Sequence, residues 1–126
     1  MIMLDTHALI WWTLDPDKLS KKAAARCNDI INTRACISSI SIWEIGIKLK
    51  NGALDIGMTI HDYCSKVKEL NCVDILPVDE NIWIESILLK WVNRDPADRV
   101  IVATARRKGI PLISKDERIK AFYRNT

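Results

Sequence analysis

The chain has 126 residues and a formal net charge of +3, and 48% of its residues are hydrophobic while 28% are charged. This length fits a single domain, 1–126, with a real core, and the composition excludes a disordered or membrane-spanning chain. No apolar run reaches the length of a membrane span, and the N-terminus lacks a basic region followed by a signal core, so we expect a cytoplasmic protein without a membrane partner. The four cysteines form no C-x-x-C pair and are expected to be reduced core thiols.

The first predicted elements are a strand and two helices. The apolar run at 1–4 is typical of a strand buried on both faces, and it ends at Asp5. Residues 8–14 predict a helix for which Thr6 is a candidate cap, and Ser20 predicts the cap of a second helix.

The middle of the chain continues the alternation of strands and helices. Residues 35–38 predict a second strand. Ser41 and Glu44 match the capping box, in which a Ser and a Glu three residues later close the start of a helix. Asn51-Gly52 predicts the end of that helix, and Thr59 predicts the cap of the next one.

A third strand is predicted at 73–78, and Pro77 indicates its end or a position at the edge of the sheet. Asp79 predicts the cap of a helix that runs to about Trp91. The buried stripe of this helix is expected to comprise Ile84, Ile87, Leu88 and Trp91.

Another helix is predicted after Asp95, which suits the N-cap, with Pro96 at the first helical position and Gly109 at the C-terminal cap. Residues 110–114 predict a fourth strand, and a short helix is expected after it. Strands and helices alternate along the whole chain, which predicts an α/β fold with a mainly parallel sheet.

Four acidic residues follow or begin these elements. Asp5 ends the first strand and Asp116 follows the last, while Glu44 and Asp98 lie in the first turns of helices. The carboxyl ends of parallel strands lie at one edge of a sheet, and the helices that follow them begin there. We therefore expect the four carboxylates to share one crevice.

Carboxylates brought together repel one another unless a cation lies between them. Hard oxygen ligands suit Mg²⁺ or Mn²⁺, whereas zinc is not favoured because the only histidines, His7 and His61, lie in separate segments. A divalent ion held by carboxylates activates water and neutralises charge at a phosphodiester, which is the chemistry of a metal-dependent nuclease.

Each acid also has a simpler explanation. Asp5 suits the cap of the first helix, and Glu44 suits the capping-box partner of Ser41. Asp98 suits a first-turn acid paired with Arg99 or Arg94, and Asp116 suits a polar turn. These explanations account for each acid alone, and they account less well for acids at nearly every junction on the same edge.

The tryptophans and the late basic residues have two interpretations each. Trp43, Trp83 and Trp91 have the spacing of helical core residues, which favours packing over base stacking. Trp11 and Trp12 are adjacent, so one of them is either a partner-binding residue or packed at an edge. The basic clusters at 106–108 and 115–124 are typical either of solvated helix faces or of a phosphate-binding surface.

Four segments together resemble the PIN-domain family, and specifically its VapC-type toxin ribonucleases. Residues 3–7 are similar to the opening strand and first acid of the family, and residues 41–48 to its second acidic motif. Residues 94–99 are similar to the third motif and 113–119 to the last. The order and spacing of the four segments make the resemblance specific, although residues 91–93 depart from the Pro- and His-containing segment that is more usual there.

The resemblance implies a single PIN-like domain with a three-layer α/β/α fold, in which helices flank a mainly parallel sheet of about four to five strands. It also implies Mg²⁺- or Mn²⁺-dependent RNA cleavage, a homodimer, and silencing by a cognate antitoxin whose C-terminal segment enters the acidic groove. The residues that match the acidic quartet of the family are Asp5, Glu44, Asp98 and Asp116.

On this hypothesis Asp5 and Asp98 hold the first metal, and Glu44 completes the metal site or orients water. Asp116 supports a second metal or the attacking water. The residues expected to support the carboxylates are Thr6 and Ser114 through their hydroxyls, and Arg99, which is expected to face a carboxylate or a phosphate.

Other classes of protein remain as alternatives. A catalytically inactive binding module would use the same acidic groove for a basic peptide. A phosphatase of the haloacid dehalogenase type would use Asp5 as nucleophile, but it needs a second Asp where His7 stands. A dinucleotide-binding domain would need a Gly-rich turn after the first strand, and none is present.

Overall fold

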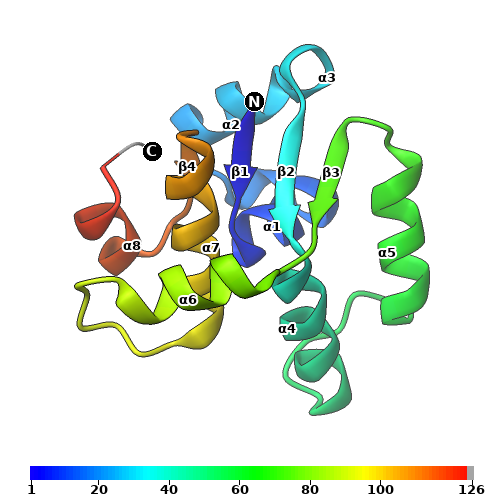
Figure 1. The fold of residues 1–126 in the computed structure, drawn as a ribbon. Helices are drawn as coiled ribbons and strands as arrows, with labels where there is room; N and C mark the ends of the chain where they lie inside the picture. The colour runs from blue at the N-terminus through cyan, green and yellow to red at the C-terminus, as the bar shows by residue number, and fades with distance from the viewer. Residues whose placement is uncertain (125–126) are drawn as a thin grey trace.

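The computed structural model describes residues 1–124, in which a parallel sheet lies between two layers of helices (Figure 1). The strands are β1 (Ile2–Leu4), β2 (Ala35–Ser38), β3 (Val73–Leu76) and β4 (Leu112–Ile113). The helices are α1 (Thr6–Leu14), the 3-10 turn η1 (Pro16–Lys18), α2 (Lys21–Asn28), α3 (Ile30–Thr33), α4 (Ser39–Lys50), α5 (Ile60–Glu69), α6 (Glu80–Leu88), α7 (Pro96–Lys108) and α8 (Glu117–Phe122). The predicted α/β class and three-layer arrangement are confirmed.

The sheet has the strand order β3-β2-β1-β4, and every neighbouring pair is parallel. Met3 of β1 lies beside Cys36 of β2 and Leu112 of β4, so the central strand fixes the register of both neighbours. β3 lies at the edge, as Pro77 indicated. All strands therefore point their carboxyl ends toward one side of the molecule (Figure 1).

Alternate side chains of the strands supply two cores, one on each face of the sheet. Leu4 and Ile37 pack into a cluster with residues from α1, α4 and α5, while Met3 and Cys36 pack into a second cluster with α7. Helices cover both faces of the sheet, which explains why β1 is a continuous apolar run, whereas the edge strand β3 includes the partly exposed Asp74.

The start of one helix decides between two candidate caps, and the start of another differs from the prediction. Asp5, and not Thr6, caps α1: its Oδ1 accepts a hydrogen bond from the Ala8 N–H at 2.9 Å, and Thr6 is the first helical residue. α4 begins at Ser39 with Ser38 as its cap, so Ser41 lies inside the helix. The capping box predicted for Ser41 is therefore wrong, because the helix starts two residues before it. The caps predicted at Ser20, Thr59, Asp79, Asp95 and Gly109 are confirmed.

The buried face of α6 also differs from the prediction. The helix ends at Leu88, and Ile84, Ile87 and Leu88 are exposed by 53%, 74% and 70%. The buried stripe runs instead through Ile82, Ser86 and Leu89. Leu89 lies just after the helix and Ser86 is polar, so the spacing of the apolar residues alone could not predict which side of α6 is buried.

The aromatic side chains divide between packing and exposure. Trp43 and Trp83 are exposed, contrary to the prediction, whereas Trp91 is half-buried and stacks on Phe122 with ring centroids 4.8 Å apart. Trp11 is half-buried at the edge of a core. All four cysteines are free, as predicted, but only Cys27 and Cys36 are buried, whereas Cys64 and Cys72 are partly exposed. Within residues 1–124 no helix has both the length and the apolar character that a membrane crossing needs.

Candidate active site

The site is built at the carboxyl edge of the sheet, where β1 and β4 end side by side. Asp5 follows β1 directly and is only 5% exposed, because its side chain turns inward to cap α1. Burial raises the pKa of the Asp5 carboxyl, and a hydrogen bond from the side chain of Ser114, just after β4, partly opposes that rise. The buried position of Asp5 thus penalises its charged form, and the hydrogen bonds from Ser114 and Ala8 offset part of that penalty.

Thr6 joins this acid to α4. Its hydroxyl donates a hydrogen bond to Oε1 of Glu44 and lies 2.9 Å from the hydroxyl of Ser41. Ser41 and Glu44 are three residues apart on α4, so both side chains face α1. Glu44 is therefore oriented by Thr6, and the alternative in which it closes the helix start is excluded.

Asp98 lies in the first turn of α7, next to the cap Asp95. Its pKa is raised to about 6, chiefly by burial and then by the charges of Asp95, Asp116 and Glu44. The amide of Asn93 donates to Oδ2 of Asp98 at 3.0 Å and opposes that rise.

Asp116 caps α8 and is bound by a neighbouring guanidinium. Arg118 donates from Nη2 to Oδ2 of Asp116 at 2.8 Å, and this pairing lowers the pKa of Asp116. The same Nη2 lies 3.6 Å from Oδ2 of Asp98. Arg118 thus contributes a positive charge between two of the four acids.

The four acids share one electrostatic neighbourhood without forming a closed ligand set. The charge of Glu44 acts on both Asp5 and Asp98, and that of Asp116 acts on Asp98. Among residues 1–124, however, no three His, Cys, Asp or Glu side chains converge closely enough to hold one metal ion. Glu44 is turned toward Thr6 and Asp116 toward Arg118, which accounts for the open arrangement.

Arg99 was predicted to face a carboxylate or a phosphate, but its guanidinium is turned toward backbone carbonyls. All of its side-chain N–H groups donate to backbone carbonyls in the last turn of α6 and in the segment between α6 and α7. Sequence reasoning missed Asn93 and Arg118 as residues that contact the acids. Arg118 lies two residues after Asp116 in a capping turn, and this spacing could have predicted their contact. No comparable pattern predicts the contact of Asn93 with Asp98.

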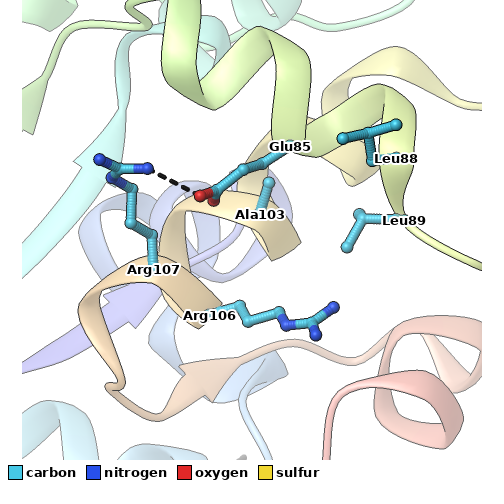
Figure 2. A pocket seen from close by; sticks show the side chains of 6 residues that line it. All are labelled: Glu85, Leu88, Leu89, Ala103, Arg106 and Arg107. Atoms are coloured by element: carbon cyan, nitrogen blue, oxygen red, sulfur yellow. Dashed lines mark hydrogen bonds and ion pairs between the residues drawn. The ribbon is translucent and has the colours of Figure 1, made fainter.

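A separate cavity of about 370 Å³ lies between α6 and α7 (Figure 2). Leu88, Leu89 and Ala103 line it, the ion pair of Glu85 with Arg107 closes one side, and Arg106 extends along another. None of the four acids lines this cavity, so it is distinct from the acidic edge.

A model of the PIN domain family matches residues 2–125. The match covers nearly the whole chain, and the chain belongs to the PIN domain family. The curated protein Ribonuclease VapC22 of Mycobacterium tuberculosis (strain ATCC 25618 / H37Rv) is 25% identical over 122 residues, which is 95% of this chain and 90% of that protein. The resemblance predicted from the four acidic segments is confirmed.

Solved structures share the fold at lower identity. A toxin–antitoxin complex from Klebsiella pneumoniae matches with a TM-score of 0.66 at 19% identity, covering 98% of this chain and 92% of that one. VapC20 of Mycobacterium tuberculosis, described as a sarcin–ricin loop cleaving toxin, matches at 0.67 and 16% identity, covering 96% and 94%. FitAcB from Neisseria gonorrhoeae matches at 0.59 and 23% identity, covering 94% and 90%.

Proposed function

We propose that this PIN-domain protein is a metal-dependent endoribonuclease that acts as the toxin of a toxin–antitoxin pair. The observation that carries the proposal is the group of four acids at one sheet edge, where burial and mutual repulsion raise the pKa of Asp5 and Asp98. Membership of the PIN family and likeness to a VapC ribonuclease support it. Perturbed carboxylates of this kind cluster at functional sites.

The donor chemistry fits Mg²⁺ or Mn²⁺ in kind. Asp5, Glu44, Asp98 and Asp116 offer only oxygen ligands, and a bound cation would offset the burial that raises the pKa of Asp5 and Asp98. Asp5 and Asp98 would hold the ion, Glu44 would complete the site or orient water, and Asp116 would act after leaving Arg118. The ion would supply an activated water and neutralise charge on the phosphodiester.

An RNA strand needs cationic groups beside such an acidic site. A cavity of about 230 Å³ adjoins Ser114 and is lined by Trp11, Lys115 and Lys120, among others. The ammonium of Lys115 lies over the Trp11 ring, 5.1 Å from its centroid. These basic side chains support RNA as the substrate, because they would hold phosphates next to Asp5.

We propose that a cognate antitoxin covers the acidic groove and that the protein acts in the cytoplasm, where its RNA is. Arg118 between Asp98 and Asp116 is a model of how a basic antitoxin side chain would bind. The same contact favours the second candidate function, a binding module for a basic peptide without activity.

We further propose that a second copy of the chain packs on the exposed apolar surface of α6. This α6 surface consists of Trp83, Ile84, Ile87 and Leu88. It is flanked by the acidic Glu85 and by the basic Arg106 and Arg107. A surface with an apolar centre and both charges at its border complements itself, as a two-fold dimer requires.

The deciding experiment compares the wild type with Asp98→Asn for growth after induction and for cleavage of cellular RNA with Mn²⁺. Because Asn keeps the shape but not the charge, we expect growth arrest and discrete fragments from the wild type only. Asp95→Asn is the matched control, since Asn also caps helices well and the change removes a charge one turn away. Cleavage by Asp98→Asn at the wild-type rate contradicts the proposal, and wild-type protein that neither arrests growth nor cleaves favours the binding module.

A further inference from the structure

The turn between α6 and α7 is closed by a single guanidinium. Arg99, in the first turn of α7, donates from Nε to the Ser86 carbonyl at 2.8 Å. Its Nη1 and Nη2 donate to the carbonyls of Trp91, Asn93, Ile87 and Leu89 at 2.8, 2.7, 3.3 and 2.7 Å. Carbonyls at the end of a helix lack partners within it and carry partial negative charge, so a cation there is favoured. Arg99 thereby fixes residues 86–93 to α7.

Asn93 is the last residue of this turn that Arg99 holds, and its side chain is held as well. The residue is 7% exposed, and its Oδ1 accepts from the Asp95 N–H at 2.9 Å. A backbone N–H can only donate, so Oδ1 must face Asp95 and Nδ2 must face the other way. Nδ2 then donates to Oδ2 of Asp98 at 3.0 Å. The orientation of the amide is therefore determined by its surroundings.

This donation settles which oxygen of Asp98 is available. Within residues 1–124 the amide of Asn93 is the one hydrogen-bond donor to the Asp98 carboxylate, and Arg118 approaches the same oxygen at 3.6 Å. Oδ1 is left for a ligand at the acidic edge. Because Oδ2 accepts from Asn93, rotation of the Asp98 carboxylate would break a charge-assisted hydrogen bond.

We propose that Asn93 is a positioning residue for Asp98 and that Arg99 acts through Asn93 by holding the turn that carries it. The inference rests on the proposed function, in which Asp98 is a ligand of the divalent ion. It assigns to Arg99 a role remote from phosphate, since none of its donors is left over. Loss of such a supporting hydrogen bond typically weakens metal affinity about 10- to 100-fold.

The test uses Asn93→Ser as its main variant. A Ser hydroxyl can still accept from an N–H two residues further on, so it keeps the turn, but it is too short to donate to Asp98. Arg99→Lys is the second variant, because an ammonium has three donors in place of five and cannot bridge the same carbonyls. Asp79→Ala is the matched control: it removes a cap from the opposite end of α6 and lowers stability without touching the acids.

The measurements are Mn²⁺ affinity by electron paramagnetic resonance of free Mn²⁺, the kcat and KM for RNA cleavage, and the melting temperature. We expect Asn93→Ser to weaken Mn²⁺ binding at least tenfold and to lower kcat at saturating Mn²⁺, with the KM for RNA within about twofold of wild type. Arg99→Lys is expected to weaken Mn²⁺ binding similarly and also to lower the melting temperature. Asp79→Ala should lower only the melting temperature.

Two failures are distinguishable. If Asp98→Asn loses Mn²⁺ binding and cleavage while Asn93→Ser and Arg99→Lys bind Mn²⁺ as the control does, the positioning role is overturned and the proposed function stands. If Asp98→Asn binds Mn²⁺ and cleaves RNA as the wild type does, the proposed function is overturned and the role of Asn93 falls with it.

Discussion

The Asp98 carboxyl makes the stability of the fold depend on pH. Its pKa is about 6 in the folded protein, against 3.8 for an ordinary Asp, because burial and the surrounding acids penalise the charged form. Between pH 3.8 and about 6, Asp98 is therefore mostly protonated in the folded state and mostly ionised in the unfolded chain. The free energy of unfolding then falls as pH rises through that window, by something on the order of 3 kcal/mol.

We expect urea unfolding, measured between pH 4 and 7.5 with EDTA present, to show this loss in the wild type. Asp98→Asn lacks the titrating group, so it should gain stability relative to wild type as pH rises. The comparison isolates Asp98, because the raised pKa of Asp5 acts in the same direction in both proteins. If the free energy of unfolding depends on pH in the same way in both proteins, burial does not destabilise the charged form of Asp98.

The positions of the acids could be predicted from the order of strands and helices. Their side-chain contacts could not be predicted from local motifs. Asp5 and Asp98 follow from the rule that parallel strands and the helices after them share one edge. The contact of Glu44 with Thr6 did not, since the local capping pattern pointed to Ser41 and a contact between residues 38 positions apart leaves no local trace. The prediction for Arg99 failed for the same reason, because the sequence around an Arg does not indicate which groups accept its hydrogen bonds.

At the scale of elements, β1 and β2 were predictable because helices cover both of their faces. Continuous apolar runs such as 1–4 and 35–37 show no helical spacing that would compete with a strand. α6 was less predictable: Ile84, Ile87 and Leu88 have helical spacing, yet Ile82 and Leu89 are the buried residues. Which side of α6 is buried depends on how α6 packs on α7, and the sequence of α6 alone does not determine that packing.

Two lysines near the end of β4 and on α8 lie beside α1, where they could bind the RNA substrate. Lys115 and Lys120 line the cavity beside Ser114, with Lys115 over the ring of Trp11. If they contact phosphates, replacing both with Gln should raise the KM for RNA and leave kcat near the wild-type value. The salt dependence of RNA binding should flatten by about 0.7 in slope for each lost contact with a single strand.

This prediction is checked by RNA binding to the inactive Asp98→Asn protein over a range of salt concentrations, with and without the two Lys→Gln changes. Lys66→Gln on α5 is the control, because Lys66 lines a different cavity, next to Tyr63. An unchanged salt slope in the double Lys→Gln variant would assign the RNA path to another surface.

At the scale of the whole molecule, the acidic edge and the α6 surface are separate features. The acids follow from the direction of the strands, whereas the cavity between α6 and α7 contains none of them (Figure 2). A dimer through α6 would therefore leave the acidic edge of each copy open to RNA or to an antitoxin. This separation allows assembly and cleavage to be tested independently.

We expect the wild type to be a dimer in solution and Ile87→Ser/Leu88→Ser to be a folded monomer. Both side chains are at least 70% exposed, so their loss should not disturb the core. Burying one such side chain is worth about 1.5–3 kcal/mol, and in a two-fold dimer each is buried twice, so the dissociation constant should rise at least about a hundredfold. Light scattering after size exclusion measures the mass, and circular dichroism checks the fold.

Ile31→Ser is the matched control, since Ile31 is 80% exposed on α3, away from α6. A double variant that remains dimeric would exclude the α6 surface, and a monomeric wild type would exclude the dimer itself.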